Sequence, residues 1–430
     1  MEFSKPSNEI LAIRCHDVTS TLAGTQVGDF DHLIIVGMAV RLALHLRGVQ
    51  AIPYDLLKQV GLHLLHIPPT SLTSVVELLG EVEFIKIDKE GKTIRAIIPT
   101  VPYYEDLFKG LGEIGGQHGF SEAEWLTLTL LERLSKGPVL EQQVHASGAE
   151  SKLVKRMVGV GVEGGYLLQR RARGKDVLLS PVYQPEHPDS FADLVAASGA
   201  ERVRKVIAMI GKNQGWPLSL VTKTKQLGQQ DITEDEIKII VTLAGDGFAP
   251  PPSIRTKHAG TNYFIFGPKP GIPRLHPTKR PVYEAAMALV AAVRQGQLLP
   301  KQYAIRSPTA LLNSLRAKRF LRANTEALEQ YREVCILKVG RLVRQSGDFC
   351  IFQLIDERPE NLEAVDMAIQ LVGGGGPAPA VDEEITLAFR KGESYLESLV
   401  SRKSLVEEKK VELDPESKRE IEDLLLGGVK

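Results

Sequence analysis

The sequence predicts a mainly α protein with small β-hairpins, an α+β fold of tandem modules followed by a flexible linker and a helical C-terminal arm. Three observations predict this fold. Segments with helical apolar spacing outnumber strand-like segments. Pairs of alternating apolar runs recur around short turns that contain glycine. The 430 residues, 43% hydrophobic and 25% charged, suffice for about two to four domains.

Composition and charge exclude several classes of protein. The formal net charge is zero, so any nucleic-acid surface must come from local segregation of charge. The three cysteines, which form no metal-binding or disulfide pattern and so indicate a reducing compartment, are Cys15, Cys335 and Cys350. The longest apolar run, Leu33–Leu46, is interrupted by Arg41 and His45 and predicts a buried helix rather than a membrane span. Because the N-terminus lacks a signal-peptide pattern, we expect a cytoplasmic protein without membrane contact.

The first predicted module, residues 1–110, has an N-terminal extension and then three helices and a hairpin. The helices are expected at about 30–46, directly after Pro53, and at 71–79. Alternating apolar residues at 81–88 and 92–99 predict two strands, which the turn at 89–91 joins.

The second module, residues 111–190, shows the same order most clearly. Ser121 and Glu124 form a capping-box pattern at the start of its first helix. Its expected elements are, in chain order, a helix at 122–135 that ends at Gly137-Pro138, a short helix, a third helix from Ser147, and a hairpin over 165–183 that turns at 173–175.

Modules three (191–275) and four (276–372) are less regular. The elements expected in module three are helices at 200–211 and 233–243 and a strand at 261–267. Those expected in module four are a helix at 282–294, a short segment at 301–305, a third helix from Ser307-Pro308, and a hairpin of 333–342 with 349–355. A Gly/Pro/Ala linker over 373–381 and a helical arm over 382–430, with thirteen acidic and nine basic residues, complete the chain.

The recurring order of three helices and a hairpin resembles the winged-helix superfamily, a helix-turn-helix variant in which the hairpin is the wing. The resemblance covers most of residues 30–370 and rests on element order. It implies that the third helix of a module can enter the major groove of DNA, while the wing contacts the backbone or the minor groove. The superfamily also includes modules that bind only protein.

Module two carries a basic face. On its third helix Leu153, Val154 and Met157 fall on one side at helical spacing, and polar residues fall on the other. The residues expected to contact DNA phosphate are Lys152, Lys155 and Arg156 on this helix and Arg170, Arg171, Arg173 and Lys175 on the hairpin. The alternative is a solvated helix with a charged hairpin tip.

Module four is the second candidate for DNA contact. From Arg294 to Gln345, eleven Lys and Arg residues face three Glu, a local charge of +8. On its third helix the side opposite Leu312 carries residues that can read base edges or approach them, namely Thr309, Asn313 and Arg316. The expected phosphate contacts are Lys318 and Arg319 at the helix end and Lys338, Arg341 and Arg344 on the hairpin.

The other modules differ in charge. Arg255 and Lys257 begin a stretch with six basic residues and no acid, which is either a loop that follows a DNA groove or a solvated connector. The third helix of module one exposes residues without positive charge, namely Thr70, Thr73, Ser74 and Glu77. That of module three carries acids that phosphate repels, namely Glu234, Asp235 and Glu236. Both patterns predict modules that are protein-facing, dimer-forming or purely structural.

No motif predicts catalysis. Gly159–Gly164 matches G-x-G-x-x-G, but it follows a helix and precedes a strand, which is the reverse of a dinucleotide site. His63 and His66 have no third ligand nearby in the sequence. We therefore expect a protein that is not an enzyme and needs no cofactor and no metal ion.

The expected function is binding of double-stranded DNA, as a transcriptional regulator or a replication or plasmid-maintenance factor. The alternative is a non-catalytic winged-helix subunit of a larger DNA-processing or defence complex that acts through protein contacts. In the C-terminal arm, Ile421, Leu424 and Leu425 form an apolar stripe. The stripe can dock on the chain's own core, on a second copy or on a partner protein.

Overall fold

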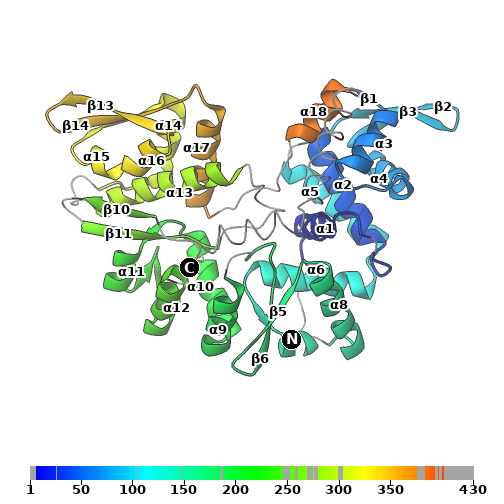
Figure 1. Ribbon diagram of the computed structural model, residues 1–430, viewed down its shortest axis with the longest axis horizontal. Coiled ribbons are helices and arrows are strands. Elements are labelled where there is room, and N and C mark those ends of the chain that lie inside the picture. Colours follow the sequence, from blue (N-terminus) through cyan, green and yellow to red (C-terminus); the bar gives the residue numbers. More distant parts are fainter. Residues whose placement is uncertain are drawn as a thin grey trace, which may run out of the picture.

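The computed structural model describes residues 6–400 except 26, 103, 147, 185–186, 246–251, 257–259, 269–274, 276–278, 299–303, 375–382, 393–395 and 397–399. As predicted, the chain is mainly helical with small antiparallel sheets. Four units share one element order, which is two helices, a short strand, two helices and a β-hairpin. In each unit the short first strand pairs with the last strand, so the strand order in the sheet is first, third, second. Figure 1 shows the four units following one another along an open arc.

Unit one contains the three helices and the hairpin that the sequence predicts, and one helix that it does not. Its elements are α1 (Asn8–Leu22), α2 (His32–Leu46), β1 (Ile52–Pro53), α3 (Tyr54–His63), α4 (Pro69–Glu81), β2 (Ile85–Glu90) and β3 (Thr93–Pro99). Helix α1, whose first turn Ser7 caps, occupies the region expected to be an extension. Because α1 buries Arg14, His16 and Asp17 beside its apolar residues, the sequence shows no clear apolar stripe there.

Apart from its first helix, which the sequence did not predict, unit two follows the prediction closely. Its elements are α5 (Tyr104–His118), α6 (Glu122–Ser135), β4 (Val139–Leu140), α7 (Glu141–His145), α8 (Ser151–Glu163), β5 (Leu168–Ala172) and β6 (Lys175–Leu179). The capping box is confirmed, because the Glu124 amide donates to Ser121 Oγ at 3.2 Å and the Ser121 amide donates to Glu124 Oε2 at 2.7 Å. Helix α8 begins at Ser151 rather than at Ser147, which lies outside the described residues.

Unit three contains an additional hairpin, β8–β9, between its third and fourth helices. Its elements are α9 (Pro188–Ser198), α10 (Ala200–Lys212), β7 (Trp216–Pro217), α11 (Leu218–Thr224), β8 (Gln226–Leu227), β9 (Gln230–Asp231), α12 (Glu234–Gly245), β10 (Ser253–Thr256) and β11 (Gly260–Ile265). The predicted helices at 200–211 and 233–243 and the strand at 261–267 are present. The predicted module boundaries at 110 and 190 fall inside α5 and α9, because a further helix precedes each expected first helix.

Unit four departs most from the prediction. Its elements are α13 (Arg280–Gln295), a 3-10 turn (Gly296–Leu298), α14 (Pro308–Lys318), β12 (Phe320–Asn324), α15 (Ala327–Gln330), α16 (Arg332–Ile336), β13 (Gly340–Ser346) and β14 (Phe349–Leu354). The expectation that the helix from Ser307 directly precedes the hairpin is wrong, because β12, α15 and α16 lie between them. The predicted first hairpin strand, 333–342, is also wrong in its first half, since residues 333–336 are helical.

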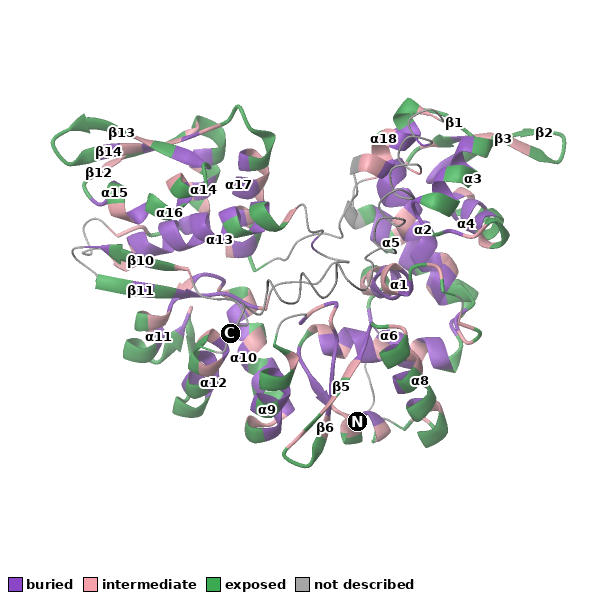
Figure 2. Ribbon diagram, in the orientation of Figure 1, coloured by how far each residue is buried: buried purple, intermediate pink, exposed green. Residues whose placement is uncertain are grey.

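The outer faces of two sheets are covered by helices of the next unit. In unit two, Leu178 faces the core shared with unit one, whereas Val177 and Leu179 face a second core that contains Phe191 and Val195 of α9. In unit three, β10 and β11 pack in the same way on α13 of unit four through a third core. Figure 2 shows α13 buried along most of its length, whereas the ends of the hairpins are exposed.

The chain returns from unit four to unit one. Helix α17 (Pro359–Val372) packs on α13 and α14, and after the residues predicted to be a linker α18 (Glu383–Lys391) packs on α2 and α3. Ile385, Ala388 and Phe389 are almost fully buried there, at 4%, 0% and 4% exposure, and belong to the core of units one and two. The first part of the C-terminal arm thus docks on the chain's own core (Figure 1). The apolar stripe at 421–425 lies outside the described residues.

Candidate nucleic-acid interface

Helix α8 of unit two presents the basic face that the sequence predicts. Val154 and Met157 are buried, whereas Lys152, Lys155 and Arg156 are exposed. Arg156 pairs with Asp29 at 2.9 Å. Lys152 and Lys155 form no ion pair with any described residue. On the same face, nothing lies within 4 Å of where a Cβ on Gly159 would stand. The face therefore combines two ammonium groups that have no ion-pair partner among the described residues with an open position at Gly159 that another molecule can approach.

The hairpin of unit two is less free than its sequence suggests. Arg170 Nε lies 2.8 Å from an oxygen of Asp189, and both Nε and Nη2 of Arg173 donate to the carboxylate of Asp193. The hydrogen bond from Arg173 holds the pKa of Asp193 below its ordinary value. Lys175 donates to the Ala196 carbonyl at 3.0 Å. Helix α9 therefore binds three of the four hairpin residues that were expected to contact phosphate. The fourth, Arg171, is exposed and forms no ion pair with a described residue.

Helix α14 does not hold the place that base readout requires. In every unit the second helix directly precedes the short strand, and the fourth helix directly precedes the hairpin. Helix α14 is the second helix of unit four, so it corresponds to α6 of unit two and not to α8. Asn313 is exposed and Thr309 half-buried, but Arg316 is ion-paired with Asp366 of α17. At the helix end Arg319 pairs with Asp356 at 3.4 Å, while Lys318 is exposed. The predicted residues share one face, yet that face lies beside α17 rather than beside the hairpin.

The hairpin of unit four places its basic residues less uniformly than the local charge of +8 suggests. Arg341 and Arg344 are exposed on β13, and Arg341 Nε donates to Gln353 at 3.1 Å. Lys338 lies in the turn before β13, with φ +59°. Arg294 is buried, and desolvation lowers its pKa to about 10, so it contributes nothing to the surface. The helix that precedes the hairpin, α16, exposes apolar residues, with Ile336 58% and Leu337 38% exposed.

The surfaces predicted for units one and three differ in charge. Arg255 is exposed on β10, whereas Lys257 lies outside the described residues. Helix α4 exposes uncharged and acidic side chains, as predicted for Thr70, Thr73, Ser74 and Glu77. The acids of α12 are satisfied within unit three, since Glu234 binds Lys225 and Glu236 binds Lys205, both at 2.6 Å. These helices thus offer no basic face.

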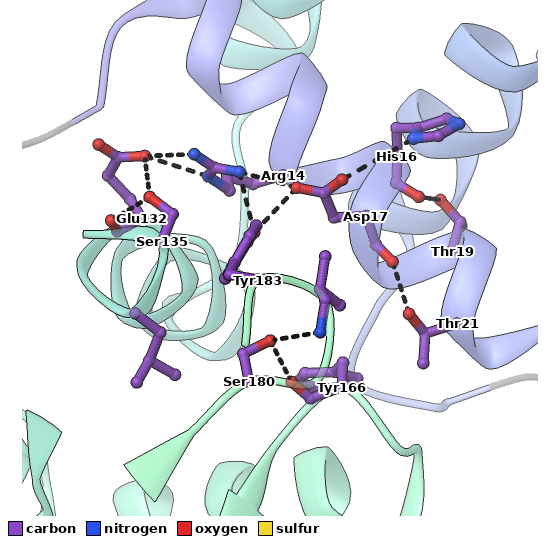
Figure 3. A network of polar contacts seen from close by, with 12 residues as sticks. Arg14, His16, Asp17, Thr19, Thr21, Glu132, Ser135, Tyr166, Ser180 and Tyr183 are labelled. Carbon is purple, nitrogen blue, oxygen red and sulfur yellow. Dashed lines mark hydrogen bonds and ion pairs between the residues drawn. The ribbon is translucent and has the colours of Figure 1, made fainter. Parts of the chain in front are cut away.

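A buried polar network, which the sequence did not reveal, joins α1 to unit two (Figure 3). Arg14 donates to Glu132 of α6 at 3.0 Å and to Asp17 at 2.8 Å, and Tyr183 after β6 donates its hydroxyl to Asp17 at 2.8 Å. Desolvation by itself lowers the pKa of Arg14, but Tyr183, Asp17 and Glu132 outweigh it, so the guanidinium stays charged. Lys136 also pairs with Glu132 at 2.9 Å, so two cations face the two carboxylates. Because the network is buried and its charges compensate one another, its role is to fix the joint between units one and two.

Among the described residues, no group of three His, Cys, Asp or Glu side chains could hold a metal ion. Gly159–Gly164 lies at the end of α8, where a Cβ on Gly161 would collide with Leu167, so this glycine serves packing. Within the same part of the chain, we find no helix long and apolar enough to span a bilayer.

Comparison with known proteins gives no relative for this chain. No family model, no curated protein and no solved structure matches it.

Proposed function

We propose that this chain is a double-stranded DNA-binding protein made of four winged-helix units, and that α8 of unit two is its main contact with DNA. Each unit has the element order of a winged helix after one leading helix, and the hairpin takes the place of the wing. In this arrangement α4, α8, α12 and α16 are the third helices. Among them, α8 has a basic exposed face.

The single observation that carries the proposal is the pair Lys152 and Lys155, exposed at the start of α8 and without an acidic partner among the described residues. An ammonium group with no intramolecular partner can displace counterions from DNA phosphates without first breaking an ion pair. The exposed Arg171 on the adjoining hairpin adds a third charge. Lys152, Lys155 and Arg171 form what we call the unit-two basic face.

Binding of the full chain to a fluorescent duplex, measured across salt concentrations, tests the proposal. We expect a steep loss of affinity with salt, and the double variant Lys152→Ala with Lys155→Ala should flatten the log–log slope by about 2. The matched control removes two exposed lysines from the hairpin of unit one, Lys86→Ala with Lys92→Ala, and should leave the slope unchanged. Equal slopes for wild type and the α8 variant would refute the assignment to unit two.

One observation favours the second candidate, a non-catalytic subunit that binds other proteins. The third helix of unit four, α16, exposes Ile336, and the exposed Leu337 follows it directly, while its one basic residue, Arg332, stands beside the exposed Glu333. A third helix with an apolar exposed face suits a protein partner better than phosphate. If the purified full chain shows no salt-dependent binding to duplex DNA, this second function is the one to pursue.

A further inference from the structure

The sheet of unit four has an outer face that no described residue covers. The inward residues of its strands, Leu321, Phe352 and Leu354, are buried in the core of the unit. The residues that alternate with them point the other way. Those on the outer face are Phe320, Arg322, Arg341, Val343, Phe349, Ile351 and Gln353. Phe320, Val343 and Phe349 are 43%, 41% and 49% exposed, so this outer face, which we call the unit-four sheet face, is apolar with two arginines and no acid.

Unit two shows how this chain covers such a face. There α9 lies on the sheet, Phe191 and Val195 supply the apolar contact, and two acids four residues apart pair with two arginines of the hairpin. The acids are Asp189 and Asp193. In unit two the occupant of the sheet face is therefore an acidic amphipathic helix. In unit three α13 covers the sheet through apolar contacts, and Glu284 is its one acid.

One segment outside the described residues, 414–426, shares the acid spacing of α9. Its Pro415-Glu416-Ser417 matches the first three residues of α9, whereas Lys418 and Glu422 stand where α9 has Phe191 and Val195. A second acid, Glu420, follows Glu416 by four residues, and Ile421, Leu424 and Leu425 supply an apolar stripe. Residues 401–413 connect it to Val400, the last described residue, and can span up to about 45 Å.

We infer that residues 414–426 are an internal ligand of this chain, an acidic amphipathic helix that docks on the unit-four sheet face of the same molecule. The apolar stripe covers Phe320, Val343 and Phe349, and the carboxylates of Glu416 and Glu420 face Arg322 and Arg341. With α18 already seated on unit one, this contact makes the C-terminal arm a strap between units one and four. The inference is independent of DNA binding.

Disulfide trapping in the full chain tests the contact. In a Cys335→Ser background, which removes the half-buried thiol, we combine Val343→Cys with Leu424→Cys. The matched control combines Leu424→Cys with Ile98→Cys, because Ile98 is 43% exposed on the sheet of unit one. Peptide mapping of the monomeric fraction should show the 343–424 disulfide forming at least about tenfold faster than the control, since docking raises the effective concentration of the two thiols.

A charge swap separates docking from chance encounter. Arg322→Glu with Arg341→Glu should slow the 343–424 disulfide at least about fivefold, and adding Glu416→Lys with Glu420→Lys should restore it. Rates equal to the control, or no rescue by the swap, would overturn the inference. A disulfide that joins two chains would also overturn it, because the occupant would then be a second copy.

Discussion

The buried network around Arg14 makes a quantitative prediction about stability. Replacing Arg14→Ala removes the guanidinium from the carboxylates of Asp17 and Glu132, which are buried at 0% and 10% side-chain exposure, and leaves Glu132 with Lys136 alone. Breaking a buried ion pair by removal of one partner lowers the free energy of unfolding by about 3–5 kcal/mol. Since units one and two share one core of under two hundred residues, the midpoint of thermal unfolding should fall by roughly 6–20 °C.

The assays are thermal and chemical denaturation of the full chain, both followed by circular dichroism. Arg173→Ala, which breaks an exposed ion pair, is the matched control and should show no measurable loss of stability. The triple variant Arg14→Met, Asp17→Asn and Glu132→Gln should recover most of the loss, because no uncompensated charge then remains.

The loss should also depend on pH. In Arg14→Ala the folded state gains stability when a proton neutralises a buried carboxylate, so folding takes up protons and stability rises as pH falls. The destabilisation should therefore be smaller at about pH 5 than at about pH 8. A loss that is independent of pH, or one no larger than that of Arg173→Ala, would refute the reasoning that the network is held by charge.

Three further predictions follow from the packing and the charges. Phe389→Ala, in the helix that returns to unit one, should cost about 3–5 kcal/mol and raise hydrogen exchange first in α2 and α3, whereas uniform exchange would contradict the docking of α18. Gly112→Ala should lower the free energy of unfolding by about 1–3 kcal/mol, because a Cβ there collides with the Asn8 carbonyl of α1, and an unchanged denaturation midpoint would argue against that close packing. Asp193→Ala should release Arg173 and steepen the salt dependence of DNA binding by up to about 1, and an unchanged slope would remove that arginine from the interface.

The sequence predicted elements that carry strong local patterns. Amphipathic spacing and caps located α6, α8 and α10 within a few residues, and the turn at Arg173-Gly174 is confirmed by positive φ at both positions. It missed β1, β4 and β7, because a two-residue strand has no periodicity and forms by pairing with a hairpin far along the chain. It placed residues 333–336 in a strand, whereas they belong to α16, in which Val334 is buried in the unit-four core.

The part of the candidate site that depends on local patterns was predictable from the sequence. The exposure of Lys152 and Lys155 follows from helical spacing alone. The neutralisation of Arg170 and Arg173 does not, since their partners lie on a helix that the sequence did not reveal. Whether a basic residue is available depends on long-range pairing, which composition cannot show.

The seating of α18 on unit one has a consequence for synthesis on the ribosome. The first unit emerges early, yet the side of its core that receives Ile385, Phe389 and Leu396 stays open until the chain has been translated past residue 396. At about 5–20 residues per second, the nascent first unit waits roughly 15–60 s with apolar surface exposed. The unit that is translated first is therefore completed only after unit four has been translated, and during that interval its open apolar surface is a target for a chaperone.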